Sequence, residues 1–140
     1  MDNIGAVFIL RSDRSALFQL RDNDPGICHA GMWVPPGGHQ EPGESIIDCA
    51  RRDVLEETTL RCDELYSLTS FIDHVKGWEP RYLHVFWTIY CKDQFVQCNE
   101  GVELKFIQRQ EAKNYDIPEY LLDLWDLALQ AYNEVKREGK

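Results

Sequence analysis

The sequence lacks several features that would place it in other protein classes. None of its apolar runs approaches the roughly 20 residues that cross a bilayer. Its five cysteines follow neither the Cys-x-x-Cys nor the Cys/His spacing of zinc sites. Residues 1–5 show neither the basic region nor the cleavage site of a secretory leader. These absences predict reduced thiols and a cytoplasmic protein that does not bind membranes.

Positive charge is also scarce, because 15 Lys and Arg residues stand against 24 Asp and Glu residues, a formal net charge of −9. Such a chain repels a nucleic acid polymer on average. A bound cation can still invert the local field and attract a phosphate. The charge therefore argues against non-specific nucleic-acid binding and leaves metal-assisted phosphate chemistry open.

The pattern of apolar residues indicates alternating strands and helices. With 140 residues, we expect a single domain over residues 1–140. Apolar runs predict strands at 4–10, 16–20, 32–34, 65–72, 83–91 and 102–107, the first two as a hairpin. Helical spacing runs from Ser45 to about Leu60, and again from Pro118. This order predicts an α/β fold, an α/β/α sandwich around a mixed β-sheet.

The first predicted helix carries three clustered acids, Asp53, Glu56 and Glu57. At about 100° per residue they occupy an arc of about 100°, mostly beside the apolar stripe that faces the core. Like charges four residues apart destabilise a helix, and a bound divalent cation would relieve that repulsion. Carboxylate oxygens favour Mg²⁺, and the sequence offers no thiolate or imidazole set for a softer metal.

A glycine-rich loop precedes this helix. Gly37, Gly38 and Gly43 would let the loop fold tightly and bring a backbone carbonyl, such as that of Gly38, toward the same cation. A cation held in this way neutralises a diphosphate and lowers the pKa of an attacking water. A carboxylate from elsewhere in the chain could then serve as the general base.

Residues 38–60 resemble the Nudix box, G-x5-E-x7-R-E-U-x-E-E-x-G-U, in which U is a bulky aliphatic residue. The positions that match are Gly38, Glu44, Arg52, Val54, Glu56, Glu57 and Leu60. Two positions depart from the pattern, because Asp53 stands in place of Glu and Thr59 in place of Gly. The order of the flanking strands and the later segment 100–106 also resemble this family.

The resemblance implies a Nudix-type pyrophosphohydrolase that depends on Mg²⁺, with Mn²⁺ as a substitute. It assigns Glu56 and Glu57 as metal ligands, with Asp53 as a third. It also implies an ion pair between Glu44 and Arg52 that braces the loop against the helix. The general base in this family often comes from a later loop; Glu100 and Glu103 are the candidates here, and Glu100 is preferred.

The two departures alter what is expected at the site. Asp53 is one methylene shorter than Glu, so its carboxylate would fall about 1.5 Å short of a cation placed for Glu, which makes it a weaker ligand than Glu57. Thr59 replaces a residue whose role would be a left-handed helix C-cap. A β-branched side chain is costly in that conformation, so we expect the helix to end differently.

Four further side chains are candidates for contacting the substrate: Arg21, Trp33, His39 and Arg81. Trp33 is better explained as core and Arg81 as an exposed arginine, a solvent position explains His39 at least as well, and Arg21 would line the mouth of the site. The resemblance implies a small-molecule substrate in which a nucleoside diphosphate is linked to another group. We expect a nucleoside triphosphate, because the chain has no extra domain for a second large group. A nucleotide sugar, a longer dinucleotide, or a weakly catalytic nucleotide sensor are the alternatives, and the protein is expected to be a monomer or homodimer.

Overall fold

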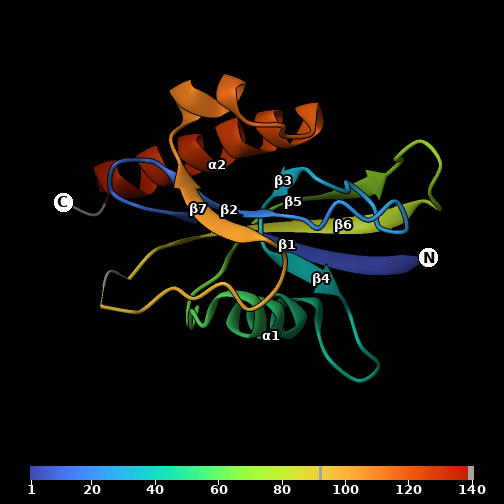
Figure 1. Ribbon diagram of the computed structural model, residues 1–140. Helices are drawn as coiled ribbons and strands as arrows, with labels where there is room; N and C mark the ends of the chain where they lie inside the picture. The colour runs from blue at the N-terminus through green and yellow to red at the C-terminus, as the bar shows by residue number, and fades with distance from the viewer. Residues whose placement is uncertain (92, 139–140) are drawn as a thin grey trace.

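The computed structural model describes residues 1–91 and 93–138 (Figure 1). Most of its strands and both long helices lie where the apolar patterns predict them. The elements in chain order are β1 (Asp2–Leu10), β2 (Ala16–Leu20), β3 (Trp33–Val34), β4 (Gly37–His39), α1 (Ile46–Thr58), β5 (Tyr66–Asp73), β6 (Arg81–Ile89), β7 (Glu103–Ile107), the 3-10 helix η1 (Arg109–Asn114) and α2 (Glu119–Glu138).

The strands form one mixed sheet that is built around β1. Five of the seven strands follow the order β3-β2-β1-β6-β5, while β4 pairs with β1 and β7 pairs with β2. The β1–β6 pair is parallel and the other pairs are antiparallel. Leu10 faces Ala16 across the β1–β2 connection, which confirms the predicted hairpin. The helices α1 and α2 cover opposite faces of the sheet (Figure 1), so the predicted sandwich is confirmed.

Side chains alternate along β1 between the two layers, as the pleat of a strand requires. Phe8 and Leu10 belong to the cluster under α2, whereas Val7 and Ile9 belong to the cluster under α1. A strand buried on both faces is a continuous apolar run, which is why residues 4–10 were recognisable. The apolar face of α2 fills the larger cluster with Leu121, Leu124, Trp125, Ala128 and Tyr132.

Two elements were not predicted, β4 and η1. In β4, Gly37 and Gly38 pair with Ala6 and Gly5 of β1 instead of forming a flexible loop. A Cβ atom on Gly37 would collide with the carbonyl oxygen of Gly5, so this close pairing requires glycine. The strand matters for the site because it delivers the glycine-rich segment directly above α1.

Two expectations about chemical environment can be compared with the structure. All five cysteines are free thiols. In the portion of the chain that the structure describes, no helix combines the length and the apolar character that crossing a membrane demands.

Candidate functional site

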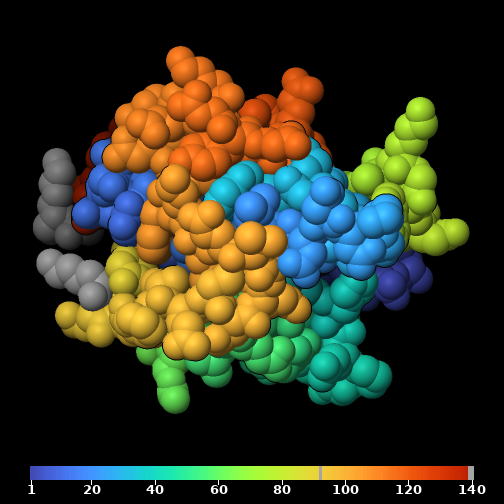
Figure 2. All heavy atoms as spheres, in the orientation of Figure 1, coloured from blue at the N-terminus to red at the C-terminus, as the bar shows by residue number. Residues whose placement is uncertain are grey.

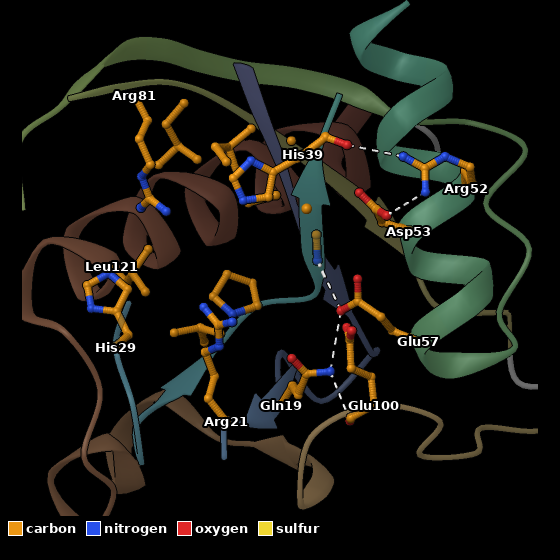
Figure 3. Close-up of a pocket in the computed structure, with 18 of the residues that line it drawn as sticks. Gln19, Arg21, His29, His39, Arg52, Asp53, Glu57, Arg81, Glu100 and Leu121 are labelled. Atoms are coloured by element: carbon orange, nitrogen blue, oxygen red, sulfur yellow. Dashed lines mark hydrogen bonds and ion pairs between the residues drawn. The ribbon is translucent and has the colours of Figure 1, made fainter. Parts of the chain in front are cut away.

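A cavity of about 380 Å³ opens where β1, β4 and β6 meet the beginning of α2 and one face of α1. Its two sides differ in chemistry (Figure 3). Asp53, Glu57 and Glu100 lie on one side, which we call the acidic side. His29 and Arg81 lie on the other, which we call the donor side.

The acidic side contains two carboxyl groups that are almost completely buried. Asp53 is 7% exposed and Glu57 is 5% exposed. Burial, together with the nearby charges of Glu100 and Asp53, raises the pKa of Glu57 to about 8. Burial also raises the pKa of Asp53, although Arg52 opposes this shift. The protein therefore concentrates negative groups in a place where their charged forms are unfavourable.

Glycine at position 38 is required by the packing of Asp53. A Cβ atom on Gly38 would lie 2.6 Å from Oδ2 of Asp53, a distance that non-bonded atoms do not tolerate. The thiol of Cys49 donates to the same Oδ2 at 3.4 Å and approaches the carbonyl of Gly38 at 3.6 Å. The β4 backbone and the Asp53 carboxylate are thus packed against each other.

The ion pair that braces loop and helix is present. Arg52 donates from Nη2 and Nε to the two carboxylate oxygens of Glu44, at 2.8 and 3.0 Å, which confirms the predicted pair. These bonds lower the pKa of Glu44 to about 2. Nη1 of Arg52 also donates to Asp53 at 3.0 Å and to Glu56 at 3.3 Å. One guanidinium therefore organises three of the acids in the motif.

The predicted ligands of Mg²⁺ are oxygen donors, as the ion prefers, but their side chains are not yet spaced to bind it together. Gly38, Asp53 and Glu57 line the cavity, and Glu100 joins them. The side chain of Glu56 is 60% exposed and paired with Arg52, outside the cavity lining. Within residues 1–91 and 93–138, no three His, Cys, Asp or Glu side chains converge closely enough to hold a metal ion as they stand. Oxygen donors that repel one another are nevertheless what a hard divalent cation stabilises.

The expectation that Thr59 would make α1 end differently is wrong. Thr59 is the C-cap residue and adopts the left-handed conformation itself, with φ 66° and ψ 2°. Its N–H donates to the carbonyl of Leu55 at 3.0 Å, and its hydroxyl donates to the carbonyl of Phe95 at 2.6 Å. These two bonds offset the strain of a β-branched residue in this conformation.

The segment that begins at Phe95 caps the end of α1 and carries Glu100 into the site. The N–H groups of Gln97 and Asn99 donate to the carbonyls of Thr58 and Glu57, each at 3.0 Å. These are among the carbonyls that a helix end leaves without partners. Figure 2 shows the segment, in yellow to orange, packed across the green surface of α1.

Gln19 completes the positioning of Glu100. Its side-chain amide donates to the carbonyl of Glu100 at 3.0 Å and to the carboxylate of Glu57 at 3.3 Å. Glu100 lines the cavity, whereas Glu103 is exposed on β7 and does not. This placement favours Glu100 over Glu103 as the candidate general base.

The donor side is a network that sequence reasoning missed, apart from Arg81. Arg81 is not an exposed arginine, because only 17% of its side chain is exposed and its Nη2 donates to Asp73 at 2.7 Å. Asp73 is 4% exposed and also accepts from the hydroxyl of Tyr120 at 3.3 Å. Nε2 of His29 lies 3.0 Å from that hydroxyl. Asp73 and Arg81 face each other across the antiparallel pair β5–β6, whereas His29 and Tyr120 come from distant segments that no local spacing connects.

The remaining substrate-binding candidates are divided. Arg21 and His39 line the cavity, and Nη1 of Arg21 donates to the carbonyl of Cys28 at 2.9 Å. Trp33 does not line it; the indole is buried and packs edge-on against Tyr115 with ring centroids 5.4 Å apart. The structure therefore favours the core interpretation for Trp33.

Comparisons with known proteins agree on one family. The family model described as NUDIX domain matches residues 1–125. The bis(5'-nucleosyl)-tetraphosphatase [asymmetrical] of Mus musculus is 30% identical over 108 residues, which cover 74% of this chain and 67% of that protein. Across the tetraphosphatases of mouse, rat and pig, the matched region spans 60–67% of the relative's length.

Solved structures share the fold. The MutT protein from Methanosarcina mazei Go1 superimposes with a TM-score of 0.78 at 19% identity and covers 94% of each chain. An Ap4A hydrolase of C. elegans, solved as a binary complex, gives a TM-score of 0.77 at 19% identity, covering 96% of this chain and 98% of that one. At these identities the likeness concerns the fold alone.

Proposed function

The chain belongs to the NUDIX domain family, and we propose that it is a Mg²⁺-dependent pyrophosphohydrolase that cleaves a diphosphate linkage in a nucleoside triphosphate. The observation that carries the proposal is the acidic side of the cavity. Asp53, Glu57 and Glu100 face a common space, and burial with mutual repulsion raises the pKa of Glu57 to about 8. When they are ionised, these acids repel a diphosphate unless a cation lies between them and the substrate, and a bound cation favours the ionised form.

The donor set supports Mg²⁺, with Mn²⁺ as a substitute. Asp53, Glu57 and the carbonyl of Gly38 would hold the ion, and Glu56 would join after exchanging its contact with Arg52 for the cation. When bound, the ion neutralises the phosphate oxygens and lowers the pKa of an attacking water. Mg²⁺ usually keeps several waters, so the shorter reach of Asp53 is compatible with contact through one of them.

The side chains around the ion then have separate roles. Arg52 holds the Asp53 carboxylate at 3.0 Å and is itself fixed by Glu44, so the acid cannot swing away from the cavity. Glu100, fixed through its own backbone by Gln19, accepts the proton of the attacking water as general base. Arg21 and His39 line the same cavity and are placed to contact phosphate oxygens.

The size of the cavity supports a substrate with one nucleoside. A volume of about 380 Å³ is at the small end of the range for small-molecule sites, about 300–1,000 Å³. A dinucleoside tetraphosphate is the second candidate, because the mouse relative is named for that activity. Its second nucleoside would have to lie outside the cavity.

Turnover of a nucleotide panel tests the proposal. The protein is incubated with Mg²⁺ or Mn²⁺ and nucleoside triphosphates, a nucleotide sugar or a dinucleoside tetraphosphate, and the products are identified by ³¹P NMR. We expect a nucleoside monophosphate and pyrophosphate from the triphosphates, and no turnover when a chelator is added. Tight binding without turnover of any compound would instead favour the sensor alternative, and fastest turnover of the dinucleotide would favour the second candidate.

A further inference from the structure

The donor side of the cavity contains polar groups that the hydrolytic chemistry does not use. Asp73 is buried on this side and accepts hydrogen bonds from Arg81 and Tyr120. Within the described residues, this single bond to Asp73 is the only one that the guanidinium of Arg81 makes, and its Nε is buried without a partner. Buried donors are normally satisfied, so the arrangement indicates a ligand that supplies further acceptors.

The hydrogen-bond chain fixes where the protons lie. The carboxylate of Asp73 can only accept, so the hydroxyl of Tyr120 donates its single proton to it. The oxygen of Tyr120 must then accept from Nε2 of His29, 3.0 Å away. Burial and the charge of Arg81 lower the pKa of His29, which keeps the ring neutral at pH 7. Nδ1 of His29 therefore carries no proton and can accept a hydrogen bond.

The backbone of His29 also supports a functional role. Its φ is 58°, a left-handed conformation that costs free energy for a residue with a side chain. Such strained residues concentrate at ligand-binding sites. Here the conformation places the imidazole against Tyr120 and on the same side of the cavity as Arg81 (Figure 3).

The resulting surface suits a neutral heterocycle better than a phosphate. Asp73 compensates the charge of Arg81, which reduces its attraction for an anion. The lone pair on Nδ1 of His29 would repel a phosphate oxygen but accept an N–H group. Every common nucleobase presents an acceptor atom beside an N–H donor, the pattern that a guanidinium and an imidazole acceptor together recognise.

We propose that Arg81 and His29, oriented by Asp73 and Tyr120, form a subsite that binds the nucleobase through an acceptor and a neighbouring N–H donor. This inference rests on the proposed function, since it takes the phosphates to lie on the acidic side. Arg81 and His29 would contact the base, whereas Asp73 and Tyr120 are positioning residues. In this arrangement the acidic side binds the phosphates of a nucleotide and the donor side binds its base.

Binding of non-hydrolysable nucleotides tests the subsite separately from turnover. The Kd values of α,β-methylene triphosphates carrying adenine, guanine, cytosine or uracil are measured by calorimetry with Mg²⁺. The tightest of them is compared with the purine riboside analogue, whose base has acceptors but no N–H donor. We expect the analogue to bind about 10- to 100-fold more weakly, because a good two-point contact to a base contributes about 1–3 kcal/mol.

Two variants and one control locate the discrimination. In Tyr120→Phe and in the paired Asp73→Asn/Arg81→Gln variant, the Kd of the purine riboside analogue should come within about threefold of the Kd of the natural nucleotide. The first variant loses the contact that fixes the tautomer of His29, and the second loses the guanidinium donor. Binding of methylenediphosphonate, which has no base, should stay unchanged in both. Arg109→Gln, which breaks an ion pair with Asp126 outside the cavity, should keep the preference of the parent protein.

The possible failures can be distinguished. Equal weakening of methylenediphosphonate and nucleotide in the paired variant would mean that Arg81 binds a phosphate, which overturns the subsite. A ¹⁵N NMR spectrum that shows the proton of His29 on Nδ1 would overturn it as well. Base discrimination without hydrolysis of any natural nucleotide would refute the proposed function and leave the subsite intact, whereas hydrolysis without discrimination would do the reverse.

Discussion

The two sides of the cavity treat buried carboxylates in opposite ways. On the donor side, Asp73 receives a guanidinium and a phenolic hydroxyl, so its charge is compensated within the protein. On the acidic side, the donors to Glu57 among the described residues are the amide of Gln19 and the N–H of Gly37, while Glu100 and Asp53 oppose its charge. The comparison teaches that burial alone does not identify a reactive acid. A reactive acid is identified by the lack of a compensating positive charge, because a bound cation would supply that charge.

The largest expected effect is on turnover, in Glu57→Gln. This change removes a charged oxygen ligand of Mg²⁺ while keeping the shape of the side chain, so we expect kcat/KM to fall about 1,000-fold, equivalent to about 4 kcal/mol of barrier. Steady-state kinetics with the preferred nucleotide measure it, and Glu134→Gln on the exposed face of α2 is the control. A rate equal to that of the parent would remove Glu57 from the ligand set.

The second effect is on stability, in Arg81→Gln on the donor side. Removing the guanidinium leaves the buried Asp73 without its ionic partner, which typically costs about 3–5 kcal/mol. Urea denaturation without nucleotide should show this loss, whereas Arg109→Gln, at a half-exposed pair, should change stability by less than about 1 kcal/mol. Equal effects of the two substitutions would mean that the donor side is not internally compensated.

The third effect is a pH dependence of stability that arises from Glu57 on the acidic side. The pKa of Glu57 in the folded protein, about 8, lies above the ordinary value of 4.5, so the folded state holds a proton that the unfolded state has lost between these pH values. Stability without metal should therefore fall as the pH rises from about 4.5 to 8, by up to about 1.4 kcal/mol per pH unit, and level off above pH 8.

Denaturation in the presence of a chelator measures this slope. Glu57→Gln should flatten it, because the substituted side chain does not titrate. Mg²⁺ should reduce it as well, since the cation stabilises the ionised form of the acid. A slope that persists in Glu57→Gln would show that another group is responsible.

The acidic side could be predicted from the sequence further than the donor side. Asp53 and Glu57 are four residues apart on α1, and a helix places such a pair on one face without reference to the rest of the fold. His29, Asp73 and Tyr120 meet only because strands and loops from distant segments pack together. The periodicity of the local sequence does not predict such contacts between distant segments.

The same reasoning explains what was missed in the fold. The two glycines of β4 have low strand propensity, and they form a strand because β1 offers hydrogen-bonding groups at a distance that only glycine permits. Thr59 is the converse case. Its conformational preference was assessed correctly, but the hydroxyl partner at Phe95 lies 36 positions away and was invisible in the local pattern.

The smallest expected effect concerns Thr59, which joins the acidic side to the segment carrying Glu100. Thr59→Gly relieves a left-handed strain of about 1–2 kcal/mol but removes a hydroxyl bond with a net contribution of about 1 kcal/mol, so stability should change by less than about 1 kcal/mol. Thr59→Ser keeps the hydroxyl and should hold the segment as the parent does. If the bond to Phe95 helps position Glu100, Thr59→Gly should lower kcat a few-fold without changing KM, and Thr59→Ser should restore it. Equal kcat in both variants would mean that Gln19 and the N–H groups of Gln97 and Asn99 suffice to place Glu100 in the cavity.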